Sequence, residues 1–74
     1  MPKLPVLSGK ELVNIFIKHG YELDHQSGSH IILRHKDPPH LRLTIPNHPE
    51  IWKKTLLSII KQANLTREEF FELL

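Results

Sequence analysis

The hydrophobic period of the chain changes at Gly20, and this change restricts the possible folds more than any other feature. Before Gly20 the apolar residues recur three and four positions apart, as they do along one face of a helix. Ser8 and Glu11 have the spacing of a capping box, in which each side chain accepts from a free backbone N–H group of the other. Gly20 suits the left-handed backbone that commonly ends a helix. The pattern predicts a helix over residues 9–19, whose apolar face carries Leu12, Ile15, Phe16 and His19.

After Gly20 the period becomes two, which indicates strands that bury one face. The alternation covers residues 21–26, and after a Ser27-Gly28 turn a second strand follows over residues 29–35. The prolines at 38 and 39 cannot donate to a sheet, so they are expected in a loop. Residues 40–45 alternate again, which completes a three-stranded antiparallel meander. In the first strand, Tyr21 and Leu23 are expected to face inward. His25 has the same parity and is a weaker third candidate.

A second amphipathic helix and a short terminal helix complete the pattern. Asn64 can close the second helix, and Thr66 with Glu69 forms a capping box that opens the last one. The fold class is therefore α+β in the order α-β-β-β-α-α, one domain over residues 1–74, with the helices on one face of the sheet. The second helix is expected to bury Trp52, Leu56, Ile59, Ile60 and Ala63, and to expose Lys54, Ser58 and Lys61.

The strand over residues 40–45 identifies the open face of the sheet. Its apolar members share one parity and must face the helices, so their neighbours His40, Arg42 and Thr44 face solvent. The second strand has three consecutive apolar residues, 31–33, and its parity must be argued. Burying His30 and Arg34 without partners would be costly, which favours the register with residues 31 and 33 inward. The open face then carries His30, Arg34, Arg42 and His40.

The composition excludes several kinds of chemistry. The chain has no cysteine, which excludes disulfides, zinc–thiolate sites and cysteine nucleophiles. The longest apolar run is three residues, too short for a membrane span, and the N-terminus lacks the apolar core of a signal peptide, so a cytoplasmic protein is expected. The formal net charge is +2, but residues 1–64 alone carry nine basic and five acidic residues. This basic body suits an anionic partner, nucleic acid above all.

A histidine with nearby arginine and lysine side chains is sufficient, in principle, to cleave RNA without a metal ion. An imidazole has an ordinary pKa near 6.5, so it can take a proton from a 2′-hydroxyl or give one to a leaving oxygen. Cationic side chains stabilise the charge on the phosphorane, and the RNA itself supplies the nucleophile. Gly28, two residues before His30, would let a phosphate approach the backbone closely. His30 is therefore a candidate catalytic residue, although a single histidine in a strand is more often structural.

Two other patterns admit simpler explanations. His30, His35 and His40 recur at intervals of five, but an odd interval within a strand reverses the side-chain face. These histidines are not expected to converge on a metal ion, and no metal or cofactor is expected. His48, in the loop after residues 40–45, is expected to cap or to pack against Trp52. Lys53, Lys54 and Lys61 form either a solvated helix face or an edge that contacts RNA phosphates.

Several segments together resemble one known family. They are Leu7-Ser8-Gly9-Lys10-Glu11-Leu12, Gly20-Tyr21, Gln26-Ser27-Gly28-Ser29-His30-Ile31-Ile32-Leu33, Leu43-Thr44-Ile45-Pro46-Asn47-His48 and the closing block over residues 55–70. On these segments the chain resembles the HicA toxins, small mRNA interferases also known as YcfA-like proteins, over roughly residues 5–74. The resemblance implies a fold like that of double-stranded-RNA-binding domains. It also implies an mRNA-cleaving toxin that a HicB-type antitoxin inhibits, either monomeric alone or hetero-oligomeric with that antitoxin.

The family's catalytic histidine corresponds to His30 and its glycine to Gly28. The expected RNA contacts come from the turn, the open face of the sheet and the second helix. They are Gly28, Ser29, Arg34, Arg42, Lys54 and Lys61. Two positions depart from the family pattern: Ser27 stands where a basic residue is common, and Lys54 stands where a glycine is usual. Because Ser27 removes a cation beside the reacting phosphate, a non-catalytic RNA-binding module with the same fold is the alternative.

Overall fold

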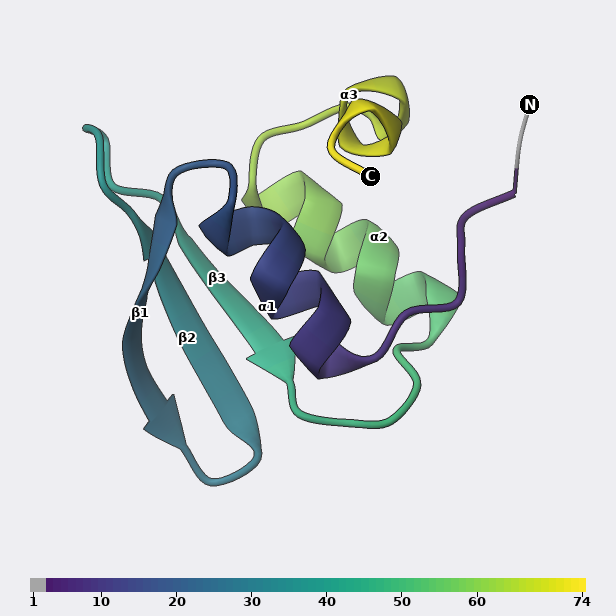
Figure 1. Ribbon diagram of the computed structural model, residues 1–74, viewed down its shortest axis with the longest axis horizontal. Helices are drawn as coiled ribbons and strands as arrows, with labels where there is room; N and C mark the ends of the chain where they lie inside the picture. The colour runs from purple at the N-terminus through teal and green to yellow at the C-terminus, as the bar shows by residue number, and fades with distance from the viewer. Residues whose placement is uncertain (1–2) are drawn as a thin grey trace.

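The order of helices and strands expected from the sequence is confirmed in the computed structural model, which describes residues 3–74 (Figure 1). The elements are α1 (Gly9–Ile17), β1 (Tyr21–Ser27), β2 (His30–His35), β3 (Arg42–Pro46), α2 (Lys53–Gln62) and α3 (Arg67–Glu72). The strands pair antiparallel in the order β1-β2-β3. α1 packs against β1 and β3, and α2 packs against β3, so the helices cover one face of the sheet (Figure 1).

Both expected capping boxes are formed. The hydroxyl of Ser8 accepts from the N–H of Glu11 at 3.1 Å, and the Glu11 carboxylate accepts from the N–H of Ser8 at 2.9 Å. Thr66 and Glu69 make the same two bonds at the start of α3. α1 ends at Ile17, two residues before the end expected from the sequence, in a turn that leads to Gly20. These local signals therefore fix where α1 and α3 begin.

Asn64 closes α2 as expected, in the left-handed conformation with φ +58°. Its N–H donates to the carbonyl of Lys61, and the N–H of Leu65 donates to the carbonyl of Ile60. This pair of bonds is the Schellman arrangement, which satisfies carbonyls that the helix end would leave free. The chain then turns directly into α3, which covers the end of the core with Phe70.

The buried core confirms the register argued for β2. Leu33, Leu43 and Ile45 are fully buried and Ile31 is nearly so. Their strand neighbours lie on the opposite face, where His30, Arg42 and Thr44 are exposed and Ile32 and Arg34 are half-buried. The helices complete the core with Leu12, Phe16, Leu56, Ile59, Ile60, Ala63 and Phe70.

The expectation that β1 buries Leu23 and His25 was wrong. Leu23 lies opposite the buried Leu33 but is 58% exposed, because β1 is the edge strand and only Tyr21 reaches the core. The pairing shifts by one residue between Leu23 and His25, which is a β-bulge at Asp24. Beyond the bulge His25 lies opposite Ile32, on the open face, so it does not pack in the core.

The third strand begins later than expected, and the second helix begins without Trp52. β3 starts at Arg42, and His40 lies in the preceding loop with φ +59° rather than on the sheet. Trp52 was expected in the core, but it is the residue before α2 and is 78% exposed. Ile51 takes the buried position in its place.

We predict that Gly9→Ala destabilises the protein. A Cβ atom at Gly9 would collide with the carbonyl oxygen of Pro46, because the start of α1 lies directly against the end of β3. Overpacking of this kind costs about 1–3 kcal/mol, while alanine gains at most about 1 kcal/mol in helix propensity. Urea unfolding should therefore show a net loss of about 1–2 kcal/mol. Lys10→Ala, at the exposed next position, should stay within about 0.5 kcal/mol of wild type. Equal stability of both variants would contradict the close approach.

Candidate functional site

The hairpin turn between β1 and β2 presents His30 at the edge of the molecule. Gly28 and Ser29 form this two-residue turn, and Ser27 pairs with His30 across it. Gly28 has φ +59°, a conformation in which glycine avoids the strain that a side chain would cause. No atom lies within 4 Å of the position that a Cβ would occupy at Gly28. The backbone of the turn is therefore open to a ligand next to His30, which is itself exposed.

His30 lines a cleft of about 460 Å³ between the sheet and α2. The sheet contributes His30, Thr44 and Pro46, and α2 contributes Thr55 and Gln62. The remaining wall comes from the loop that joins β3 to α2, with His48, Glu50, Ile51 and Trp52. The cleft thus joins three parts of the chain that are distant in sequence.

Backbone hydrogen bonds hold these parts together. The N–H of Asn47 donates to the carbonyl of Ser29 at 2.6 Å, which ties the loop after β3 to the hairpin turn. The N–H of Gly9 donates to the carbonyl of His48 at 2.9 Å, which ties the same loop to α1. The side chain of Gln62 accepts from the N–H of Thr44 at 3.0 Å. This last bond satisfies a donor on β3, an edge strand, and fixes α2 beside it.

His48 is the residue that the sequence reasoning undervalued. It was expected to cap or to pack against Trp52, but it is exposed and lines the same cleft as His30. A signal for this was present, because an antiparallel meander pairs the start of β2 with the end of β3. His30 lies opposite Pro46, so His48, two positions further along, reaches the same end of the sheet.

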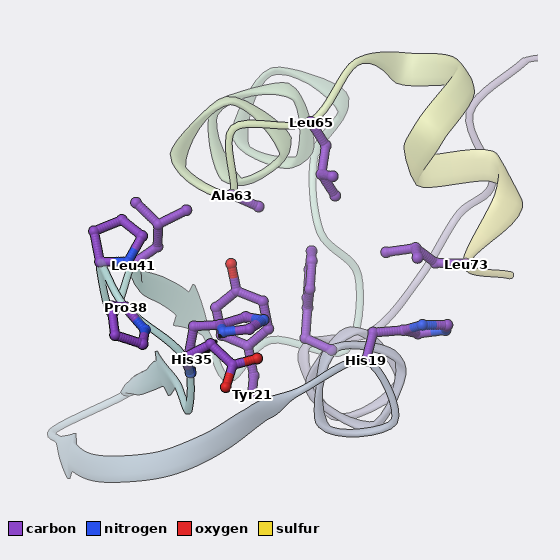
Figure 2. Close-up of a pocket in the computed structure, with 11 residues that line it drawn as sticks. His19, Tyr21, His35, Pro38, Leu41, Ala63, Leu65 and Leu73 are labelled. Atoms are coloured by element: carbon purple, nitrogen blue, oxygen red, sulfur yellow. Dashed lines mark hydrogen bonds between the residues drawn. The ribbon is translucent and has the colours of Figure 1, made fainter.

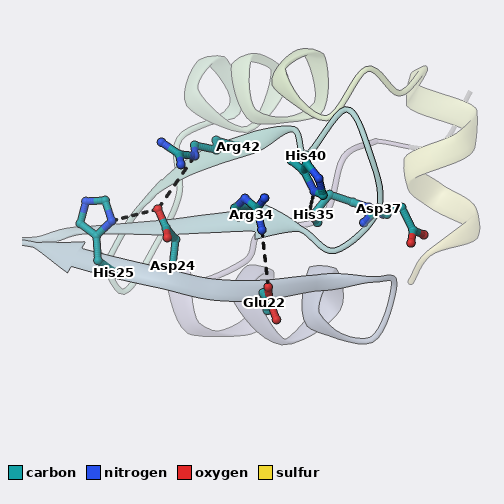
Figure 3. Close-up of polar contacts among 8 residues, drawn as sticks. All are labelled: Glu22, Asp24, His25, Arg34, His35, Asp37, His40 and Arg42. Carbon is teal, nitrogen blue, oxygen red and sulfur yellow. Dashed lines mark hydrogen bonds and ion pairs between the residues drawn. The ribbon is translucent and has the colours of Figure 1, made fainter.

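The open face of the sheet carries both expected arginines, and each lies beside a carboxylate (Figure 3). Arg34 lies 3.9 Å from Glu22, and Arg42 lies 3.9 Å from Asp24, which also contacts His25 at 3.1 Å. The bulge in β1 directs Asp24 across the sheet toward Arg42. Exposed ion pairs of this length are weak, about 0–1 kcal/mol, so the arginines remain able to exchange partners.

The remaining expected RNA contacts lie outside the cleft. Arg34 and Arg42 face each other across β2 and β3, four residues and roughly 13 Å along β2 from His30. Lys54 and Lys61 are exposed on α2, and neither lines the cleft. The structure therefore places Gly28, Ser29 and His30 at one site, and the four cationic side chains lie outside it.

A second cavity, of about 210 Å³, lies at the other end of the sheet beneath α2 and α3 (Figure 2). His35 packs edge-on against Tyr21 there, with ring centroids 4.7 Å apart. Its Nδ1 accepts from the N–H of Asp37 at 3.0 Å, which leaves the ring proton on Nε2. The Nδ1 of His40 donates to the carbonyl of His35 at 3.1 Å, since a carbonyl can only accept. His35 and His40 thus order the loop between β2 and β3.

The three regularly spaced histidines lie in different places: His30 on the open face, His35 in this cavity and His40 in the loop. Within residues 3–74, no group of three histidine, aspartate or glutamate side chains is arranged to hold a metal ion. None of the helices described is long and apolar enough to cross a membrane.

Residues 9–65 match the model of one protein family, the HicA toxin of bacterial toxin–antitoxin systems. The match begins with α1 and ends just after α2, so it includes the whole sheet and every residue that lines the His30 cleft. The chain therefore belongs to the HicA family and is a toxin of a toxin–antitoxin system. Comparison with curated proteins and with solved structures found no match.

We predict a loss of stability at high pH that depends on Tyr21, the only tyrosine in the chain. Burial raises the pKa of Tyr21 above its ordinary value of 10.0, so the unfolded chain releases this proton more readily than the folded protein. The free energy of unfolding should therefore fall as the pH rises through about 10 and beyond. Tyr21→Phe keeps the ring contacts with Phe16 and His35 and should remove this part of the pH dependence.

The measurement is urea unfolding of both proteins across the alkaline range, with phenolate absorbance as a direct titration of Tyr21. Lysines titrate in the same range but affect both proteins alike, so the difference between the two curves isolates Tyr21. Parallel curves, or a phenolate that titrates below pH 10 in the folded protein, would contradict the prediction.

Proposed function

We propose that this HicA-family toxin cleaves mRNA, with His30 as a catalytic proton-transfer group. The observation that carries the proposal is the position of His30: exposed, lining a cleft, and next to a turn whose backbone is open at Gly28. A phosphate lying against this turn would place its ribose within reach of the imidazole. Membership of the HicA family, whose members are generally mRNA interferases, supports the same activity.

The proposed reaction uses the 2′-hydroxyl of the RNA as the nucleophile. His30 accepts the proton of the 2′-hydroxyl while its oxygen attacks the adjacent phosphorus. A bond forms between the 2′-oxygen and phosphorus, and the bond from phosphorus to the 5′-oxygen breaks. The leaving oxygen needs a proton, and in this proposal His48, which lines the same cleft, donates it. The products are a 2′,3′-cyclic phosphate and a 5′-hydroxyl, and no metal ion is required.

Cationic side chains outside the cleft bind the flanking RNA in this proposal. Arg34 and Arg42 lie on the same open face as His30, so one RNA strand can follow β2 from the cleft to the two arginines. Lys54 and Lys61 extend the positive surface along α2. The phosphates displace Glu22 and Asp24, whose ion pairs with the arginines are long and exposed.

The same face is proposed to bind the antitoxin. A HicB-type partner that covers His30 would exclude RNA, and its acidic side chains would take the places of Glu22 and Asp24 beside the arginines. Inhibition then follows from competition for one surface. Because its substrate is mRNA, the free toxin acts in the cytoplasm.

We predict that His30→Ala lowers the rate of RNA cleavage by about 10²–10⁴-fold, the usual contribution of a proton-transfer group. The stability should change by no more than about 0.5 kcal/mol, because His30 is exposed and outside the core. The affinity for RNA should persist, since phosphate contacts supply most of it. Cleavage of a labelled RNA, urea unfolding and RNA binding measure the three quantities.

His19→Ala is the matched control, because His19 is exposed at the end of α1 and does not line the cleft. It should cleave at the wild-type rate. A folded His30→Ala protein that cleaves as fast as wild type would remove His30 from the mechanism. A wild-type protein that binds RNA but never cleaves it would establish the non-catalytic module instead.

A further inference from the structure

Trp52 is the most exposed large hydrophobic side chain among residues 3–74, at 78%. It has no evident structural task. It precedes α2 with extended backbone, and its side chain makes no capping hydrogen bond. Successive side chains of an extended segment point in opposite directions, so Ile51 is buried while Trp52 faces solvent. The indole is therefore free to pack against a ligand, and aromatic side chains of this kind are enriched at interfaces.

Trp52 separates the His30 cleft from a second hollow. This neighbouring groove, of about 580 Å³, lies between the N-terminal segment and the start of α2, which run beside each other in Figure 1. The groove carries three cations, Lys3, Lys53 and Arg67, and one acidic residue, Glu50. The rest of its lining is apolar: Leu4, Pro5, Val6, Ile51, Trp52 and Leu56. No ion pair within residues 3–74 engages the three cations. The groove is therefore suited to a polyanion that continues from the cleft past the indole.

We propose that Trp52 is a stacking platform for one unpaired nucleobase of the RNA, and that the basic groove binds the phosphates beyond it. This inference rests on the proposed function for the identity of the His30 site. The scissile phosphate lies at His30, the base beside it stacks on the indole, and the chain continues along Lys53 toward Lys3 and Arg67. Stacking of this kind tolerates any base, because every base has a π-face.

The proposal requires that the RNA be unpaired at the nucleotide that lies on Trp52. Bases in a duplex are already stacked on each other and do not expose a face to a side chain, whereas unpaired bases do. A protein partner is the alternative occupant of Trp52. The three free cations beside the indole favour a nucleic acid, because they complement a row of phosphates.

Trp52 is the only tryptophan in the chain, so its fluorescence reports on this position alone. The probe is a single-stranded, fully 2′-O-methylated oligoribonucleotide, which lacks the 2′-nucleophile and is not consumed by wild-type protein. We expect a saturable change in Trp52 fluorescence on titration with the single strand. The same sequence annealed to its complement should cause a much smaller change at equal concentration.

Five variants test the contacts by RNA binding. Trp52→Ala should weaken binding of the single strand roughly 5- to 100-fold, and Trp52→Phe should restore most of the loss. Leu23→Ala, which removes another exposed apolar side chain, should bind as wild type. Lys53→Gln should reduce the slope of log affinity against log salt by about 0.7, and Lys36→Gln at the other end of the sheet should leave it unchanged.

Single-strand binding without a fluorescence change, together with wild-type affinity of Trp52→Ala, would overturn the proposal and leave Trp52 to a protein partner. Equal fluorescence changes with single strand and duplex would also overturn it. These outcomes are independent of catalysis. Loss of stacking with His30-dependent cleavage intact would refute only this inference, and stacking without His30-dependent cleavage would refute only the proposed mechanism.

Discussion

The structure depends on the close contact between the start of α1 and the end of β3. Gly9 has no side chain, so its N–H can reach the carbonyl of His48 while its Cα lies against Pro46. The next hydrogen bond along this segment, from Asn47 to Ser29, joins the same loop to the hairpin turn. A loop that would otherwise be free is thus fixed on both sides. The two histidines of the cleft are brought together by backbone bonds, without any direct bond between their side chains.

The sequence was sufficient for features that depend on neighbouring residues. Capping boxes, the left-handed Asn64 and the inward parity of β2 and β3 all follow from local chemistry and periodicity. They define the α+β fold, and they place His30 correctly on the open face. The tertiary arrangement decided the rest. Leu23 has the alternation of a buried residue but lies on an edge strand of which only Tyr21 reaches the core, so pattern alone could not show its exposure.

Trp52 illustrates the same limit at the site. Its spacing with Leu56 fits a buried helix face, but the chain enters α2 one residue later and buries Ile51 instead. The expected core residue therefore becomes a wall of the His30 cleft. For the arginines, the position was predicted correctly but the neighbouring side chains were not. Arg42 was placed on the correct face, but the bulge that brings Asp24 beside it could not be read from the sequence. Lys3, Lys53 and Arg67, which have no ion-pair partner within residues 3–74, lie in the groove beyond Trp52.

In the proposed mechanism the cleft positions RNA so that its own 2′-hydroxyl attacks the phosphate next to His30. The most direct test is an RNA with one 2′-deoxynucleotide, placed on the 5′ side of a bond that the wild-type protein cleaves. If the 2′-hydroxyl is the nucleophile, cleavage should stop at that bond and continue at the others. The all-ribose RNA should give 2′,3′-cyclic phosphate and 5′-hydroxyl ends. Cleavage at the deoxy position, or 5′-phosphate ends, would show that water is the nucleophile and would rule out this mechanism.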